Sequence, residues 1–280
     1  MIEIKNLTFS YSKKGSPVLH NLEGCIKPDI YLLAGENGAG KTTLLHLLAG
    51  VASPSSGAIL IDGIYPDSDN PAEKGDIFLL EENTLFPLKS IRKFAKYHSR
   101  FYPAFSEERF LNNLHAFGLT GDEPAKSLSL GNRKKSLLAY VLALGVKTLL
   151  LDEPTNALDI ESKDVLRSLI ASNIGEDQTL IVSTHTVSEL ENLFDGAIMM
   201  RKGDLLWCGT AEDASSRLAF EKSRYSEPDA LYEESKLGYY DSILPVVGDE
   251  STNVDWLLLY SALHSPKSNE VLNQLKQTSK

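Results

Sequence analysis

The stretch from Ile30 to Gly50, IYLLAGENGAGKTTLLHLLAG, restricts what this chain can fold into more than any other. A short apolar run is followed by glycines and then by apolar residues at helical spacing, which predicts a strand, a loop and a helix. The loop matches G-x-x-x-x-G-K-[ST], a pattern in which backbone N–H groups surround a polyphosphate. Glycine is needed there because the backbone takes positive φ and approaches the phosphates closely. We therefore expect a nucleoside triphosphate to bind to this loop.

The loop and the first helical turn supply the candidate phosphate ligands. They are Gly35, Glu36, Asn37, Gly38, Ala39, Gly40, Lys41, Thr42 and Thr43. In this pattern the lysine reaches the β- and γ-phosphates and the Thr42 hydroxyl holds Mg²⁺. The helix that begins at Lys41 adds the positive end of its dipole.

Length and composition indicate a soluble, globular chain. Its 280 residues suffice for one large core with an appendage, or for two modest domains. The longest uncharged apolar run, Leu137 to Val146, covers about ten residues, fewer than the roughly twenty that span a bilayer. The net charge of −10 argues against non-specific nucleic-acid binding, which needs a basic surface. The N-terminus MIEIK has no signal-peptide character, so we expect the cytoplasm.

Polar side chains follow several of the predicted strands. Asp152 and Glu153 end the apolar strand from Thr148, and Pro154 stops that strand. His185 follows the strand Thr179–Ser183, and a polar cluster of Glu81, Glu82 and Asn83 follows the strand Ile77–Leu80. Ligand contacts in α/β sheets lie at such carboxyl ends. We expect one of these two adjacent carboxylates to face the metal and its neighbour to act on water, with His185 in a catalytic role. For the cluster of Glu81, Glu82 and Asn83, a solvated turn is an equal alternative.

Helical spacing replaces the strand pattern between Ser90 and Leu119, which predicts a helical insert broken near Pro103 and Ser106. The insert is rich in aromatic residues. Packing in the core explains them more simply than a surface that binds a partner. Tyr11, at the end of the opening strand, could face an adenine ring or belong to the core. Cys25 and Cys208 are far apart in sequence, so we expect two buried apolar side chains and neither a disulfide nor a metal site.

The order and spacing of these parts resemble the ATP-binding cassette (ABC) ATPases over residues 1 to about 212. Gly35 to Thr43 resembles the Walker A loop, Leu149 to Glu153 the Walker B strand with its catalytic glutamate, and Ala157 to Asp159 the D-loop. The remaining matches are Ser129 and Gly131 in the signature motif, Glu81 at the Q-loop glutamine, His185 at the switch histidine and Tyr11 at the adenine-stacking aromatic.

This resemblance implies an α/β fold, the P-loop NTPase cassette with a parallel core sheet, an antiparallel β subdomain and a helical subdomain at about 87–135. Residues 213–280 would add a small α/β appendage, with a polar, disordered end after about 265. The implied cofactors are ATP and Mg²⁺, the metal held by Thr42, Asp152 and Glu81. The implied partners are a second cassette, whose Ser129 and Gly131 meet the γ-phosphate across a dimer, and a membrane-spanning subunit at the inner face of the cell membrane. No nucleic acid is implied.

Two departures from the family pattern are visible. The signature reads LSLGN instead of LSGGQ, and Glu81 stands where glutamine is usual. The segment FYPAFSEERF, together with S-x-G-x-x-K-K, is similar to bacterial exporter cassettes for antibiotics and peptides. The leading hypothesis is thus the ATPase subunit of an exporter. The alternatives are a soluble regulatory or assembly ATPase and an importer subunit.

Overall fold

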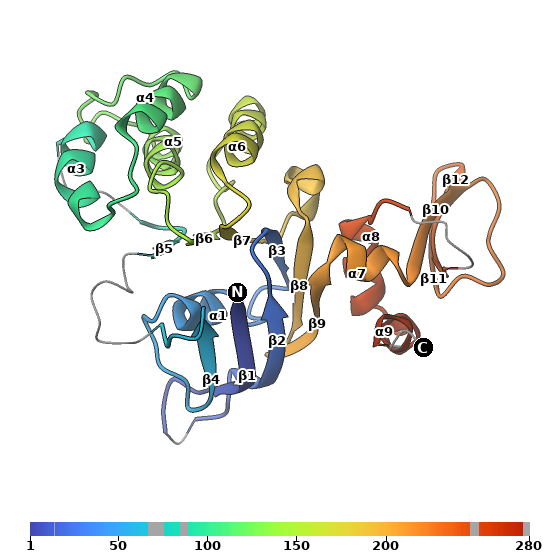
Figure 1. Cartoon of the computed structure of the whole chain (residues 1–280). Coiled ribbons are helices and arrows are strands. Elements are labelled where there is room, and N and C mark those ends of the chain that lie inside the picture. Colours follow the sequence, from blue (N-terminus) through green and yellow to red (C-terminus); the bar gives the residue numbers. More distant parts are fainter. Residues whose placement is uncertain (14, 67–75, 85–88, 247–251, 277–280) are drawn as a thin grey trace.

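The computed structural model describes residues 1–13, 15–66, 76–84, 89–246 and 252–276, and these contain three β-sheets (Figure 1). The predicted start of the helical subdomain at 87 and the last residues of the chain lie outside the described residues. The central sheet has the order β5-β6-β7-β3-β8-β9. Its strands are β3 (Ile30–Ala34), β5 (Ile77–Leu80), β6 (Thr148–Asp152), β7 (Thr179–Thr184), β8 (Gly196–Arg201) and β9 (Asp204–Thr210).

Five strands of the central sheet are parallel, and β9 pairs antiparallel with β8. Alternate residues enter two different apolar clusters: Leu149 and Leu151 of β6 face one, and Leu150 faces the other. A sheet covered on both faces needs apolar residues on both sides of each strand. This explains why β6 reads as an unbroken apolar run until Asp152.

Helix α1 (Lys41–Leu48) lies between the central sheet and an antiparallel sheet of β1 (Ile2–Phe9), β2 (Leu19–Ile26) and β4 (Ser56–Ile61) (Figure 1). Its Leu44 and Leu45 are fully buried in one cluster with Ile2, Leu150 and residues of β2 and β4. The phosphate loop is therefore fixed at both ends, by β3 before it and by the buried face of α1 after it.

The helical part consists of α3 (Ile91–His98), a 3₁₀ turn (Ser99–Phe101), α4 (Glu107–Ala116) and the first part of α5 (Leu130–Val141); α6 (Ile160–Asn173) follows β6. The side chains of Ser90, Ser106 and Ser129 cap the three helices that follow them. Most aromatic residues of the insert form one cluster around Tyr140, which is fully buried. The contacting rings are Phe94, His98, Phe105 and Phe110, with Tyr102 packed on His98. Core packing is thus confirmed for this cluster.

The appendage contributes the sheet β10-β12-β11, with β10 (Leu218–Ser223), β11 (Tyr232–Lys236) and β12 (Tyr239–Pro245), and the helices α8 (Trp256–His264) and α9 (Ser268–Lys276). A short helix α7 (Ala211–Ser215) spans the predicted boundary at 212/213. Leu218, Ile243 and Trp256 belong to the same apolar cluster as β6 and β7. Because the two parts share this cluster, the predicted division into domains stays a prediction.

Three expectations from the sequence are wrong in detail. The stretch after 265 is not all disordered, because α9 buries Val271 and Leu275. The sequence from Val187 to Leu193 predicts one helix, but the structure has two separate 3₁₀ turns there, Val187–Glu189 and Glu191–Leu193. Cys25 is exposed, because Gly24 occupies the inward position of β2, against Leu205 and Cys208 of β9. Among the described helices, none combines the length and apolarity needed to cross a bilayer.

Trp256 tests whether the appendage belongs to the core. Its side chain is 2% exposed, its indole N–H donates to the Phe194 carbonyl oxygen at 3.0 Å, and its ring centroid lies 6.0 Å from that of Trp207. We expect Trp256→Ala to lower the free energy of unfolding of the whole chain by about 3–5 kcal/mol. Leu257→Ala, at a 37% exposed position of the same helix, is the control and should cost less than about 1 kcal/mol. Urea unfolding measures both, and an unchanged main transition in Trp256→Ala would make the appendage an independent unit.

Candidate nucleotide site

The phosphate loop and the ends of two other segments form one pocket at the carboxyl edge of the central sheet. Ten residues line it: Val18, Asn37, Gly38, Gly40, Lys41, Thr42, Thr43, Glu82, Asp152 and Glu153. The loop follows β3, Glu82 follows β5, Asp152 is the last residue of β6 and Glu153 comes directly after it. The parallel arrangement places these three strand ends at one edge, where α/β folds bind ligands.

Two glycines of the loop cannot carry a side chain. Gly40 has φ of +100°, and a Cβ there would lie 2.6 Å from Cδ2 of Leu19. A Cβ on Gly35 would lie 2.8 Å from the carbonyl oxygen of Met200 in β8. The loop therefore packs directly on β2 and β8 through bare backbone, and its shape depends on those strands.

Lys41 is the cation of the pocket. Its side chain folds over the loop, and Nζ donates to the carbonyl oxygens of Gly35 at 2.7 Å and Glu36 at 3.4 Å. Burial lowers the pKa of Lys41, while the charges of Glu153 and Asp152 oppose that change. The ammonium group therefore lies within the pocket and near both acids, where it can meet a phosphate.

Thr42 and Asp152 present a pair of oxygen ligands. The Thr42 hydroxyl donates to Oδ2 of Asp152 at 2.8 Å, and the Ser183 hydroxyl donates to the other carboxylate oxygen. Mg²⁺ prefers oxygen ligands and usually takes one or two from the protein, the rest coming from phosphates and water. The described residues hold no group of three or more His, Cys, Asp or Glu side chains that could bind a metal by themselves. This pair therefore fits Mg²⁺ that is shared with a nucleotide.

Glu153 and His185 form a second pair. Glu153 has φ of +45°, a conformation that is uncommon outside glycine and that clusters at functional sites. Its backbone N–H donates to the Ser183 carbonyl oxygen at 3.1 Å, and Oε2 lies 2.9 Å from Nδ1 of His185. Glu153 lines the pocket beside Asp152, and the half-exposed His185 ring contacts its largely buried carboxylate.

The two acids after β5 are placed differently from the expectation. Glu81 Oε1 lies 2.8 Å from Nε2 of His46 on α1, and Glu81 is not among the residues that line the pocket. Glu82 lines the pocket instead. The chain turns directly after Glu81, where the Thr84 N–H donates to the Glu81 carbonyl oxygen at 3.2 Å, and this turn gives the two side chains different neighbours. The sequence places Glu82 in the polar cluster at this strand end, but the pattern assigns the site role to Glu81 and gives no signal that distinguishes the two acids.

The signature and D-loop residues lie outside this pocket wall. Ser129 caps α5 by accepting from the Asn132 N–H, and a Cβ on Gly131 would lie 2.7 Å from the Ala157 carbonyl oxygen. Between them, Leu130 is 66% exposed. Asp159 caps α6, and hydrogen bonds from the Ser162 hydroxyl and backbone N–H, followed by the contact with Lys135, lower its pKa to about 2. The structure thus brings the signature against the D-loop of the same chain.

Tyr11 lies beside the pocket. Its ring is 67% exposed, its hydroxyl is 2.9 Å from Oγ1 of Thr43, and its edge packs against Phe9. The ring is therefore placed on the surface next to the phosphate loop, and it is not part of the core.

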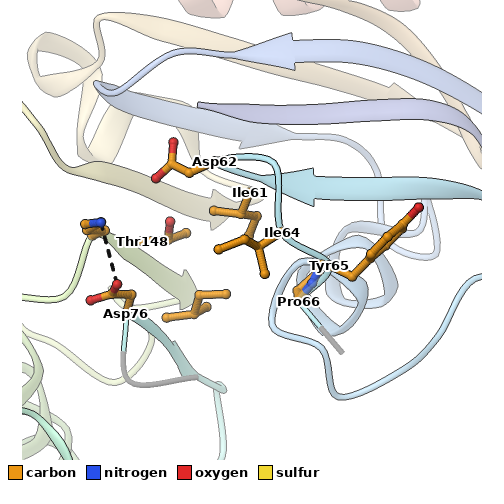
Figure 2. A pocket seen from close by; sticks show the side chains of 9 residues that line it. Ile61, Asp62, Ile64, Tyr65, Pro66, Asp76 and Thr148 are labelled. Atoms are coloured by element: carbon orange, nitrogen blue, oxygen red, sulfur yellow. Dashed lines mark ion pairs between the residues drawn. The ribbon is translucent and has the colours of Figure 1, made fainter. Parts of the chain in front are cut away.

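A separate hollow lies at the opposite, amino edge of the central sheet (Figure 2). It is lined by Ile61, Ile64, Tyr65 and the first residues of β5 and β6, and Asp76 forms an ion pair with Lys147 at 3.6 Å. Its lining is mainly apolar, and the acids of the phosphate pocket take no part in it.

Comparison with known proteins identifies the family of this chain. The family described as "ABC transporter" matches residues 19–156. The lantibiotic transport ATP-binding protein SrtF of Streptococcus pyogenes is 34% identical over 209 residues, which are 74% of this chain and 89% of SrtF. The energy-coupling factor transporter ATP-binding protein EcfA2 of Methanospirillum hungatei is 33% identical over 248 residues, 82% of this chain and 61% of that protein.

Among solved structures, the dimeric, post-hydrolysis cassette MJ0796 bound to ADP and Pi has a TM-score of 0.65 at 24% identity. The match covers 75% of this chain and 98% of that one, and it shows the fold. Since SrtF exceeds 30% identity and is spanned almost completely, the chain belongs to the family of ABC transporter ATP-binding proteins, which are ATPases.

Proposed function

We propose that this ATP-binding protein hydrolyses Mg²⁺-bound ATP to drive a membrane exporter through a separate membrane-spanning subunit. The observation that carries the hydrolytic part is the meeting of Lys41, Thr42, Asp152 and Glu153 on one pocket wall. Phosphoryl transfer to water depends mainly on positioning and on charge stabilisation. These residues supply one cation, one hydroxyl and two carboxylates at the end of a phosphate loop, which are the groups that this chemistry requires.

The roles follow from position and charge. Lys41 and the loop N–H groups bind the β- and γ-phosphates, and Thr42 and Asp152 hold Mg²⁺, which neutralises phosphate charge when it is bound. Glu153 accepts a hydrogen bond from the attacking water and orients it. His185, whose Nδ1 lies 2.9 Å from Oε2 of Glu153, fixes that carboxylate and contacts the γ-phosphate. Glu82 adds a third carboxylate to the wall, on the side of the helical part.

A second cassette is part of this proposal. Ser129 and Gly131 do not line the pocket of their own chain, so their contact with ATP requires another copy or a related chain. Leu130 lies between them at the first position of α5 and is 66% exposed. The dimeric, ADP-bound MJ0796 cassette shares the fold, which supports an ATP-dependent dimer of this chain.

The transport direction rests on the relative SrtF, whose name describes lantibiotic transport, and on the similarity of the helical segment to exporter cassettes. The protein would lie on the inner face of the cell membrane through its partner. For the partner's docking site, we favour the outer face of α3 and the turn after it. Tyr97 and Phe101 are 56% and 71% exposed there, and Arg100 lies over the Tyr97 ring. Exposed aromatic and arginine side chains are frequent anchors of protein interfaces.

Glu153→Gln tests the hydrolytic assignment. It removes the charge that orients water and leaves the phosphate ligands in place, so we expect ATP to bind within about threefold of wild type while turnover falls by at least about a hundredfold. The variant should accumulate as an ATP-bound dimer in size-exclusion chromatography. Lys41→Ala should instead weaken ATP binding itself in calorimetry. Near-normal turnover of Glu153→Gln would rule out the assigned role of this carboxylate.

Tyr11→Ala tests adenine stacking. We expect it to weaken ATP and ADP equally, by about 1–3 kcal/mol, the range for a base stacked on an aromatic ring. Tyr11→Phe keeps the ring and removes the hydroxyl that contacts Thr43, so its nucleotide affinities should stay near wild type. Fluorescence titration measures both. A loss confined to ATP, or an equal loss in Tyr11→Phe, would assign the effect to the phosphate loop and contradict stacking.

Phe101→Glu tests the docking face. A charge at this exposed position should reduce co-purification with the membrane-spanning subunit and stop transport in cells, while the ATPase activity of the isolated chain persists. Leu237→Glu, at a fully exposed position of the appendage, is the matched control and should change neither. Normal co-purification of Phe101→Glu would move the docking site elsewhere.

A further inference from the structure

Lys134 is a buried cation that the roles given above do not use. It lies on α5, five residues after Ser129, and is only 6% exposed. Its Nζ donates to the carbonyl oxygen of Glu82 at 3.2 Å. Burial lowers the pKa of Lys134, and the nearby charges of Glu82, Asp152 and Glu153 act in the opposite direction. Helix α5, which begins at the signature, therefore places the positive charge of Lys134 near the three carboxylates of the pocket.

Glu82 is held from two sides. Lys134 binds its backbone carbonyl, and Nδ2 of Asn156 donates to its carboxylate Oε1 at 2.6 Å. Asn156 belongs to the loop after β6, and its own N–H donates to the carbonyl oxygen of Glu153 at 3.3 Å. Three segments thus meet at Glu82: the end of β5, helix α5 and the loop that carries Glu153.

Stability alone does not account for a lysine at this place. Removing an ammonium group from water costs several kcal/mol, and an apolar side chain of similar length would fill the same space without that cost. Neighbouring positions of α5, such as Leu137 and Leu138, are filled in that apolar way. The charge at position 134 is therefore best explained by what it contacts.

We propose that Lys134 is a positioning residue for ATP hydrolysis: it fixes the Glu82 segment against the nucleotide pocket and links the signature end of α5 to the carboxylates there. This inference rests on the proposed hydrolytic site. Lys134 lies five positions after Ser129, a rise of about 7.5 Å along a helix. A movement of α5 when Ser129 meets a second cassette is thus passed directly to Glu82, without a flexible segment in between.

The test compares Lys134→Met with Glu82→Ala in steady-state ATPase assays of the full chain. We expect Lys134→Met to lower kcat by roughly ten- to a hundredfold, the scale of a small misplacement near reacting groups, with KM and ATP affinity within about threefold of wild type. Lys134→Gln, which is shorter and uncharged, should give the same pattern if Lys134→Met folds poorly. Lys147→Gln, a 61% exposed lysine whose ion pair lies at the far edge of the sheet (Figure 2), is the control and should match wild type.

Two measurements separate a positioning role from a merely structural one. In the Glu82→Ala background, Lys134→Met should cost less than about threefold in kcat, because both changes disrupt one unit. Hydrogen exchange at the backbone amides of residues 81–84 should become at least about tenfold faster in Lys134→Met, with the interior of α5 unchanged. The proposal would be overturned if the two substitutions lowered kcat multiplicatively, or if the hydrogen-exchange rates of residues 81–84 stayed unchanged in Lys134→Met.

The outcomes for the site and for Lys134 are distinct. Wild-type turnover in both Glu82→Ala and Glu153→Gln would refute the hydrolytic site itself. Impaired Glu82→Ala alongside a wild-type Lys134→Met would refute the inference about Lys134 alone.

Discussion

The complete burial of β6 is the constraint on which the rest of the structure depends. All five residues from Thr148 to Asp152 are buried, with neighbours β5 and β7 on both sides and an apolar cluster on each face. A strand in this position cannot shift by one residue without turning Leu150 to the wrong face. The register therefore fixes where the strand ends, and with it the location of Asp152 and Glu153. The rigidity of this apolar strand therefore fixes the positions of the two adjacent carboxylates.

Those carboxylates would repel each other in a buried site without balancing charges and donors. Glu82, Asp152 and Glu153 share one pocket wall, and two buried lysines, Lys41 and Lys134, lie near them from α1 and α5. Hydroxyl donors from Thr42 and Ser183 occupy both oxygens of Asp152. Each acid is thus supported by an element other than the one that carries it. The site exists only when the central sheet, α1 and the helical part are assembled together.

The sequence was sufficient for the features that depend on local pattern. The phosphate loop, the buried strand before Asp152 and the helix break near Ser106 were all predictable, because turn glycines, apolar runs and helix-breaking residues act over a few positions. The choice between Glu81 and Glu82 was not predictable, because it depends on how the turn after β5 places the two side chains, and Glu81 contacts His46 on α1. Helix α9 was missed because its apolar positions are sparse. Val271 and Leu275 are enough to hold this helix in place only because they pack against the rest of the core.

The same dependence on distant contacts reaches from the appendage to the phosphate loop. Helix α8 packs along β8, where Nε2 of His264 lies 3.2 Å from the Met200 carbonyl oxygen. The His264 ring also packs against the Tyr260 ring at a tilt. That carbonyl is the atom that excludes a side chain at Gly35. Burial raises the pKa of Tyr260, and the charge of Glu36 in the loop raises it further. Because the backbone of Met200 contacts α8 on one side and the phosphate loop on the other, a change in the packing of α8 would reach the nucleotide through a single strand.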